Sequence, residues 1–291
     1  MSAELTLLLV PKYQDVVRPD QWLERTRTKI NPKSLELLGR VGLEGVVRGF
    51  VPDGAVAWDV PFDDYQPTHV DQPYGLITGR DMEEVDERPP APSGEIEPFG
   101  IEQVLDRVPS RFISWELRGP VQYDECGFPR HPVGRTGIDG RLTMNRYGPT
   151  FAVDAIVIDD LGNNVDPLDW KILVVVRTDN NTIALPAGKI DEGETPRQAL
   201  RRETKEETGF DFDFSDARLV FLGAVDDDRN ADGAWFETAA ASIKARDSSK
   251  INPKAEEDDV VRAQWMTARD ILSSQTHAST ELFIRLALGI S

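Results

Sequence analysis

The sequence predicts an α/β fold in which a mixed sheet flanked by helices is preceded by a smaller N-terminal domain. Residues 151–158 and 171–176 are rich in β-branched residues and flank a connection rich in Gly, Asn, Asp and Pro, which indicates two paired strands. Residues 196–208 carry helix signals at both ends. Residues 81–98 combine acidic side chains with four prolines. Such a segment has few apolar side chains to bury, and its prolines lack the backbone N–H groups that helices and sheets need as hydrogen-bond donors. We interpret this stretch as a linker or a long exposed loop.

A length of 291 residues suffices for about two domains. We therefore predict two domains, with the linker as part of the first. The first domain comprises residues 1–120 and ends in the acidic, Pro-rich linker at about residues 81–98. The second domain comprises residues 121–291. Near the start of the chain, the apolar residues 5–10 predict a buried strand.

The N-terminal apolar run is too short for a membrane span, which needs about 18 or more apolar residues. No cationic segment precedes the run, so a typical targeting peptide is not indicated. We therefore expect no membrane insertion of this chain and a cytoplasmic location.

The chain is strongly acidic, with 33 Lys and Arg against 51 Asp and Glu and a formal net charge of −18. This charge repels phosphate backbones and anionic membranes, so we expect no nucleic-acid partner. The single cysteine, Cys126, excludes an intrachain disulfide and cysteine-rich metal sites. A polyanionic ligand would therefore require metal ions or a local basic pocket.

The remaining elements complete the predicted second domain. Residues 217–225, 234–244 and 260–266 are typical of further strands, and residues 280–288 are apolar at helical spacing. Strands and helices in this order predict a mixed sheet covered by helices.

The helix at residues 196–208 is delimited by local signals. Thr195 is suited to the N-cap, with Gln198 completing a capping box. Pro196 suits the first helical position, and Gly209 suits the position after the last turn. These signals predict the helix without reference to the rest of the chain.

Three glutamates share one face of this helix. Glu203, Glu206 and Glu207 stand at i, i+3 and i+4, so their carboxylates repel one another by a few tenths of a kcal/mol per pair. A solvated helix face, with Arg202 paired to Glu206, tolerates such crowding. Divalent cations such as Mg²⁺ or Mn²⁺ prefer oxygen ligands, so a metal-binding face is the second interpretation.

The loop before the helix decides between these interpretations. Residues of fixed type recur at fixed spacing: Gly188, Glu194, Arg202, Glu203, Glu206, Glu207, Gly209 and the apolar Phe210. This pattern, Gly-x5-Glu-x7-Arg-Glu-U-x-Glu-Glu-x-Gly-U, resembles the box of the Nudix family. Thr204 departs from it at a position that the family usually fills with an apolar residue.

The resemblance implies a Nudix α/β/α sandwich that hydrolyses a diphosphate with Mg²⁺, or with Mn²⁺ in its place. It implies the following metal ligands: Gly188 through its carbonyl, Glu203, Glu206 and Glu207. Arg202 would orient a glutamate, and Glu194 would brace the loop against the helix. The acidic run at residues 256–259 resembles a family loop, and we take Glu257 as the candidate general base.

A second resemblance narrows the family. Residues 134–141 with 147–149, and residues 226–238, are similar to segments of mitochondrial-type ADP-ribose pyrophosphatases. The same segments occur in the ADP-ribose-sensing C-terminal domain of melastatin-type TRP channels. Asp228 departs from the family's proline, and Thr150 departs from its asparagine.

This second resemblance, together with charge, indicates the substrate-binding residues. They are Arg135, Arg141, Asp232 and Arg229. The guanidinium group of arginine, with its several hydrogen-bond donors, is suited to a diphosphate or ribose pocket in an acidic protein. We interpret Trp235 as a core residue and His277 as a surface histidine.

The resulting prediction is hydrolysis of ADP-ribose to AMP and ribose 5-phosphate with Mg²⁺. One alternative is an ADP-ribose-sensing domain with little or no turnover, within a larger channel polypeptide. The presence of all three box glutamates favours turnover. Another alternative is a Nudix pyrophosphatase for a different nucleoside diphosphate derivative, such as a nucleotide sugar.

Overall fold

A computed structural model describes residues 24–87, 101–159, 166–178, 181–245, 253 and 260–290. The predicted strand at residues 5–10, the end of the predicted linker and Glu257 lie outside the described residues. No described helix is long and apolar enough to cross a membrane.

The centre of the fold is a mixed sheet of seven strands with the path β11-β6-β5-β10-β9, to which β7 adds on β6 and β8 on β5. Its strands are β5 (Gly148–Asp159), β6 (Lys171–Arg177), β7 (Ile183–Ala184), β8 (Ala187–Lys189), β9 (Arg218–Ala224), β10 (Ala234–Lys244) and β11 (Val260–Thr267). β10 runs parallel to β5, and the other pairings are antiparallel. The predicted mixed sheet is therefore confirmed.

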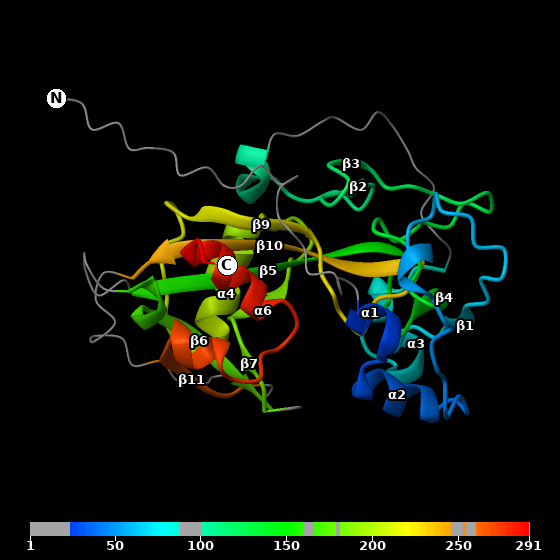
Figure 1. The fold of residues 1–291 in the computed structure, drawn as a ribbon, viewed down its shortest axis with the longest axis horizontal. Helices are drawn as coiled ribbons and strands as arrows, with labels where there is room; N and C mark the ends of the chain where they lie inside the picture. Colours follow the sequence, from blue (N-terminus) through cyan, green and yellow to red (C-terminus); the bar gives the residue numbers. More distant parts are fainter. Residues whose placement is uncertain are drawn as a thin grey trace.

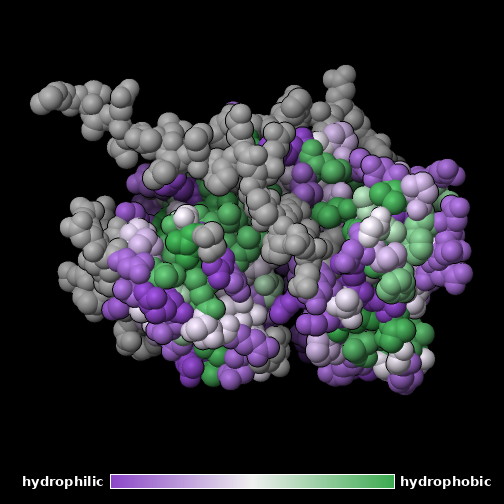
Figure 2. Space-filling model, viewed as in Figure 1, coloured by the Kyte–Doolittle hydropathy of each residue, from purple (hydrophilic) through white to green (hydrophobic). Residues whose placement is uncertain are grey.

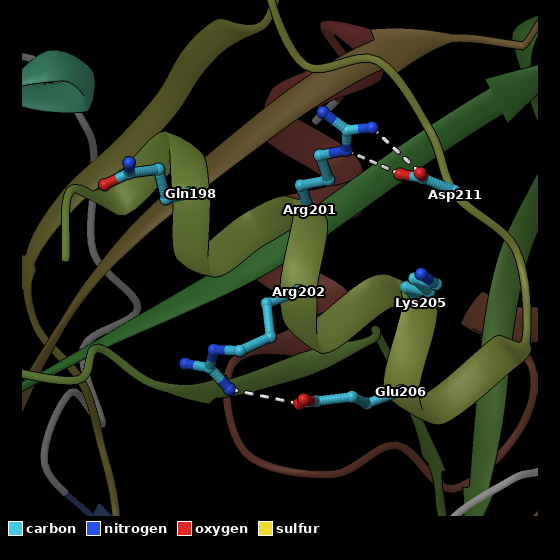
Figure 3. Close-up of a pocket in the computed structure, with 6 residues that line it drawn as sticks. All are labelled: Gln198, Arg201, Arg202, Lys205, Glu206 and Asp211. Atoms are coloured by element: carbon cyan, nitrogen blue, oxygen red, sulfur yellow. Dashed lines mark hydrogen bonds and ion pairs between the residues drawn. The ribbon is translucent and has the colours of Figure 1, made fainter.

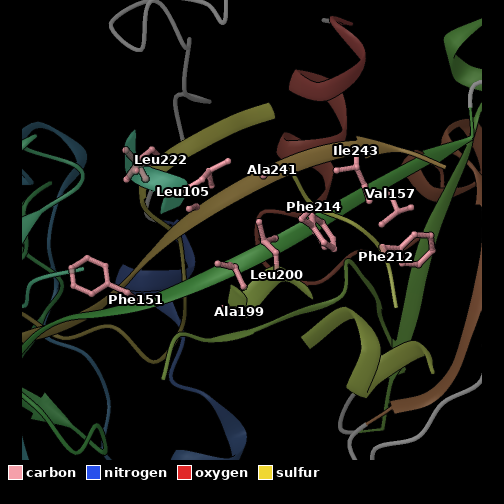
Figure 4. Packing of buried hydrophobic residues seen from close by; sticks show 14 of the residues in the cluster. Leu105, Phe151, Val157, Ala199, Leu200, Phe212, Phe214, Leu222, Ala241 and Ile243 are labelled. Atoms are coloured by element: carbon pink, nitrogen blue, oxygen red, sulfur yellow. The ribbon is translucent and has the colours of Figure 1, made fainter. Parts of the chain in front are cut away.

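Helices cover both faces of this sheet (Figure 1). Val153, Val157 and neighbouring side chains of β5 pack with Leu200 of α4 (Pro196–Thr208) in one buried cluster, part of which Figure 4 shows. The alternate residues of β5, among them Ile156, pack with Phe283 of α6 (Thr280–Leu288) in a second cluster. Side chains of a strand alternate between faces, so one strand supplies both cores. The α/β/α sandwich is confirmed; α5 (Ala268–Leu272) lies on the α6 side.

The predicted limits of α4 are also confirmed. Thr195 and Gln198 form a reciprocal capping box, Pro196 occupies the first turn, and Gly209 has φ of 71° after the last turn. Thr204, which departs from the family pattern, is fully buried, and its Oγ1 donates to the Leu200 carbonyl at 2.6 Å. This bond satisfies the hydroxyl in the core.

The N-terminal part is built from short elements around a small cluster that includes Leu38, Val70 and Ile138. Its elements are α1 (Glu24–Thr28), α2 (Pro32–Gly39), β1 (Thr68–Asp71), α3 (Tyr74–Thr78), β2 (Ile113–Ser114), β3 (Gly119–Pro120), β4 (Ile138–Leu142) and the 3₁₀ turns Asp53–Ala55, Met82–Glu84 and Ile101–Asp106. β1 pairs in parallel with β4, so this contact crosses the predicted domain boundary at residues 120/121. The division at that point stays a prediction.

The face of the molecule in Figure 2 carries mainly hydrophilic residues, with apolar residues in separate patches. Among the described residues, the most exposed large apolar side chains are Phe50 and Val47, at 80% and 68% exposure. Both belong to the N-terminal part.

Glu237 anchors β10 to the segment that carries β2. Its carboxylate accepts hydrogen bonds from the Ser114 hydroxyl at 2.7 Å, from the Trp235 indole at 2.8 Å and from the Trp115 amide at 2.5 Å. Burial raises the pKa of Glu237 to about 7, although these bonds oppose the rise. Trp235 is fully buried, which confirms its interpretation as a core residue.

Candidate active site

Arg202 organises the acidic face of α4. Its Nη1 donates to Glu203 Oε1 at 2.7 Å and to Glu206 Oε2 at 3.1 Å, the second of which Figure 3 shows. Its Nη2 donates to the Lys189 carbonyl at 2.9 Å and so ties α4 to β8. One guanidinium thus supplies countercharge to two glutamates and fixes their helix against the sheet.

Glu194 holds the far side of the same guanidinium. Arg202 Nε and Nη2 donate to its two carboxylate oxygens at 3.0 and 2.7 Å. The second oxygen also accepts from the Asp191 amide at 3.0 Å. Burial alone would raise the pKa of Glu194, but the bonds from Arg202 outweigh it and lower the pKa. Glu194 therefore stays ionised and braces the loop against α4, as expected.

Glu203 lies directly over Gly188 of β8. A Cβ atom built on Gly188 would fall 2.0 Å from the carboxyl carbon of Glu203 and 2.1 to 2.2 Å from its two oxygens. Glycine is thus the one residue type that leaves this carboxylate in place. The position explains why a glycine starts the pattern.

Gly188→Ala is expected to lower kcat at least about tenfold, because displacing a reacting group by about 1 Å is costly. The melting temperature should change by only a few degrees, since the displaced atoms end a flexible side chain. Steady-state kinetics and thermal unfolding measure both quantities. Gly39→Ala is the matched control, because its Cβ would meet only Glu44 Cγ at 3.8 Å. Equal rates for the two variants would contradict a functional role for Glu203.

Glu207, like Glu203, meets strand β8. It is 3% exposed, and its Oε2 accepts a hydrogen bond from the Ala187 amide of β8 at 2.9 Å. Within the described residues, no three acidic, His or Cys side chains are already arranged as a metal site. The face nevertheless fits a hard divalent cation, because its donors are all oxygens and Gly188 leaves room for a carboxylate beside its own backbone.

A depression of about 500 Å³ adjoins this face on the outer side of α4 (Figure 3). It is lined by Gln198, Arg201, Arg202, Lys205, Glu206 and Asp211. Arg201 and Asp211 form an exposed ion pair across it at 2.6 Å. Glu203 and Glu207 do not line it, so it shares only an edge with the acidic face.

The structure gives Arg135 a structural role that the sequence did not indicate. Its guanidinium donates to three carbonyls of the N-terminal part, those of Ala55 at 2.8 Å, Ala57 at 2.6 Å and Val60 at 3.1 Å. It also lies 5.1 Å from the ring centroid of Trp58, and the residue is 8% exposed. Its substrate-binding role stays a prediction without a supporting contact.

Arg141 is enclosed in a similar way. Its Nε donates to Asp71 at 2.6 Å, and its Nη1 donates to the carbonyls of Asp86 at 2.7 Å and Asn145 at 2.9 Å. The residue is 4% exposed. These contacts hold the N-terminal part together, and here too a substrate contact stays a prediction.

Asp232 lies between the two parts of the chain. Its Oδ2 accepts from the Tyr65 hydroxyl at 2.5 Å, and its Oδ1 accepts from the Thr136 amide at 2.7 Å. Burial raises the pKa of Asp232 to about 6, although these bonds act against the rise. The structure does not bring it to Arg229, which pairs with Asp227 instead.

A second group of charged residues lies on the α6 face of the sheet. Asp154 interrupts the apolar strand β5 and accepts from the Thr238 hydroxyl at 2.7 Å. Burial raises the pKa of Asp154 to about 6, and the charge of Asp227 adds to the rise. Asp154 pairs in register with Ala187, and the Ala187 amide donates a hydrogen bond to Glu207. This strand position connects the second group to the acidic face of α4.

Asp227, Arg229 and His277 complete the second group. Arg229 Nε and Nη2 donate to the Asp227 carboxylate at 2.8 and 2.6 Å. Burial alone would raise the pKa of Asp227, but Arg229 outweighs it and lowers the pKa to about 2. Burial lowers the pKa of His277 to about 4, helped by Arg177, Arg229 and Arg25 and opposed by Asp227. The surface interpretation of His277 is therefore wrong, because the ring is half-buried among charged groups.

Sequence reasoning did not single out Asp154, Asp227 or Thr238. A carboxylate inside a buried strand is rare, so Asp154 carried a usable signal. Asp227 and Thr238 lie in the segment 226–238 that resembles the family, but the resemblance alone did not give their contacts.

Two family models match adjacent parts of the chain. A model described as "NUDIX domain" matches residues 148–286, and one described as "NUDT9-like, N-terminal domain" matches residues 51–148. The boundary between these matches lies at the start of β5.

Three relatives show the range of proteins that this chain is similar to. "Putative nudix hydrolase 6" of Caenorhabditis elegans is 30% identical over 246 residues, which cover 81% of this chain and 88% of that protein. "ADP-ribose pyrophosphatase, mitochondrial" of Rattus norvegicus is 32% identical over 56% of this chain and 54% of that protein. "Transient receptor potential cation channel subfamily M member-like 2" of Nematostella vectensis is 29% identical over 66% of this chain and 13% of that protein.

Proposed function

The chain belongs to the Nudix family, and on this premise we propose that it hydrolyses ADP-ribose to AMP and ribose 5-phosphate with Mg²⁺, or with Mn²⁺ in its place. The observation that carries the proposal is the acidic face of α4, where Arg202 holds Glu203 and Glu206 beside Gly188. The choice of ADP-ribose is supported by the rat relative, an ADP-ribose pyrophosphatase by name.

Glu203, Glu206 and the Gly188 carbonyl would hold the metal, and we propose Glu207 as a further ligand. When bound, a divalent cation neutralises diphosphate charge and activates water for attack at phosphorus. Arg202 keeps two carboxylates on one face of α4 and sets their direction. Glu257, which lies outside the described residues, stays the proposed general base.

The second charged group is suited to bind the remainder of the nucleotide. Asp154 accepts hydrogen bonds, and Arg229 offers a partly exposed guanidinium whose centre lies 4.1 Å from the ring centroid of Phe236. We propose that these residues, with His277, contact the substrate beyond its diphosphate. Arg135, Arg141 and Asp232 would then act by holding the N-terminal part in place.

The substrate proposal is tested by comparing kcat/KM for ADP-ribose, ADP-glucose and UDP-glucose, with products identified. ADP-ribose should be preferred at least about tenfold, which corresponds to ~1.4 kcal/mol, because one well-placed polar contact suffices for that difference. UDP-glucose controls for diphosphate chemistry without the adenine base. A preference for either nucleotide sugar would overturn the substrate and leave the Nudix assignment intact.

A second candidate function is sensing of ADP-ribose with little or no turnover. It is supported by the channel relative, of whose length this chain spans 13%. The chain would then be part of a larger channel polypeptide. Calorimetric binding of ADP-ribose without release of AMP would favour this function over hydrolysis.

The cellular location also stays a proposal. We propose a cytoplasmic location, whereas the rat relative is mitochondrial by name. We propose ADP-ribose as a small-molecule partner and no nucleic-acid partner.

A further inference from the structure

Helix α1 precedes the segment that matches the N-terminal family model, and it contacts the loop between β9 and β10. The amides of Arg25 and Thr26 donate to the Asp226 carboxylate at 3.0 and 2.8 Å. The first amides of a helix have no partner within it. A carboxylate 200 residues later in the sequence therefore satisfies the start of α1.

Thr26 connects α1 to the interior of this loop, residues 226–230. It is fully buried, and its Oγ1 donates to the Asp227 carbonyl at 3.0 Å and accepts from Asn230 Nδ2 at 3.2 Å. Asn230 is also fully buried, and its Oδ1 accepts from the Phe236 amide at 2.9 Å. One hydroxyl thus links α1 to both halves of the loop and, through Asn230, to β10.

Two further residues of the N-terminal part hold the same backbone. The Asn31 amide donates to the Asp228 carbonyl at 3.2 Å, and its Nδ2 donates to Asp228 Oδ1 at 3.1 Å. Arg48 Nη2 donates to the carbonyls of Asp228 at 3.1 Å and Asn230 at 2.7 Å. The carbonyls of residues 227, 228 and 230 are therefore all held from the N-terminal part.

The side chains of Asp227 and Arg229 are directed to other partners. They pair with each other, and the Arg229 guanidinium lies over the ring of Phe236. Both also act on His277, which precedes α6. In Figure 1, α1 lies on the side of the N-terminal part that faces α6. The backbone of the loop is thus held on one side while its charged pair is presented on the other.

We propose that Thr26 is a positioning residue: it fixes the backbone of the 226–230 loop and thereby the direction in which the Asp227–Arg229 pair meets the nucleotide. We call these contacts of Thr26 with the 226–230 loop the clamp. The identity of the nucleotide rests on the proposed function, whereas the clamp does not. Thr26 touches no substrate, so it acts through binding and leaves the metal-binding face of α4 unchanged.

Thr26→Val tests the proposal in the full chain, because valine keeps the shape and removes the hydroxyl. KM for ADP-ribose should rise about tenfold while kcat changes by less than about twofold, as expected when only uniform binding is lost. Thr26→Ser should restore KM, since it restores the hydroxyl. Thr28→Val is the matched control, because the Thr28 hydroxyl bonds only within α1, to the Glu24 carbonyl at 2.6 Å.

Hydrogen exchange of the unliganded protein gives a readout that a general loss of stability does not move. At a temperature where all variants are folded, Thr26→Val should increase the exchange rate of the amides of residues 226–236 more than that of the amides of α4. An unchanged KM with unchanged exchange in this loop, or failure of serine to rescue, would overturn the clamp. If the wild-type protein releases no AMP, the proposed function fails, and the clamp is then judged by exchange and by a tenfold weaker calorimetric affinity for ADP-ribose.

Discussion

Removal of divalent cations is expected to abolish hydrolysis of ADP-ribose, and added Mg²⁺ is expected to restore it. On the acidic face of α4, the single guanidinium of Arg202 is shared by the carboxylates of Glu203, Glu206 and, from the preceding loop, Glu194. A diphosphate adds further negative charge, and the chain as a whole carries −18. Without metal ions, substrate and site repel each other. AMP release in excess chelator, with metal analysis of the protein, measures the effect.

Thermal unfolding provides a readout of metal binding that does not require turnover. A ligand that binds only the native state stabilises it by about 2.7 kcal/mol at 100 times its dissociation constant. Mg²⁺ should therefore raise the melting temperature of the wild-type protein and raise that of Glu206→Gln less. Full activity in chelator, with metal analysis confirming removal, would eliminate the proposed mechanism.

The elements that the sequence predicted well are those whose signals are local. Thr195, Pro196 and Gly209 act on their own helix, so α4 begins and ends at its predicted residues. The β-branched runs likewise marked β5 and β6, whereas the short strands β7 and β8 were not predicted. The parallel pairing of β10 with β5 joins residues far apart in the chain, and no local pattern encodes it.

The contacts of the predicted substrate-binding residues, in contrast, could not be predicted from local sequence. An arginine in a glycine-rich loop looks the same in sequence whether it meets a phosphate or a set of carbonyls. The carbonyls that bind Arg135 lie 75 to 80 residues earlier in the chain. Burial among non-local partners therefore decided the contacts of Arg135 and Arg141. The sequence indicated Arg229, but its pairing with Asp227 and the partial burial of His277 beside them were not predicted, for the same reason.

Glu206→Gln is expected to lower kcat for ADP-ribose about 100-fold or more, because it removes an anionic ligand of the proposed metal ion, which would stabilise the charge developing at the reacting diphosphate. The variant should keep the fold, since the Glu206 side chain is 42% exposed. Its pair with Arg202 spans i to i+4, and such pairs contribute only about 0.2–0.5 kcal/mol. The melting temperature should thus shift by only a few degrees.

Glu192→Gln is the matched control for this variant, because it makes the same substitution at an exposed position of the preceding loop. If both variants retain near-normal kcat, the glutamates of α4 form a solvated charge face and the catalytic assignment fails. If Glu206→Gln loses activity together with a large part of its thermal stability, the residue is structural, contrary to the proposal. Loss of kcat with a retained melting temperature separates catalysis from folding, because the contacts of Arg202 with Glu194 and Lys189 are left intact to hold α4 on the sheet.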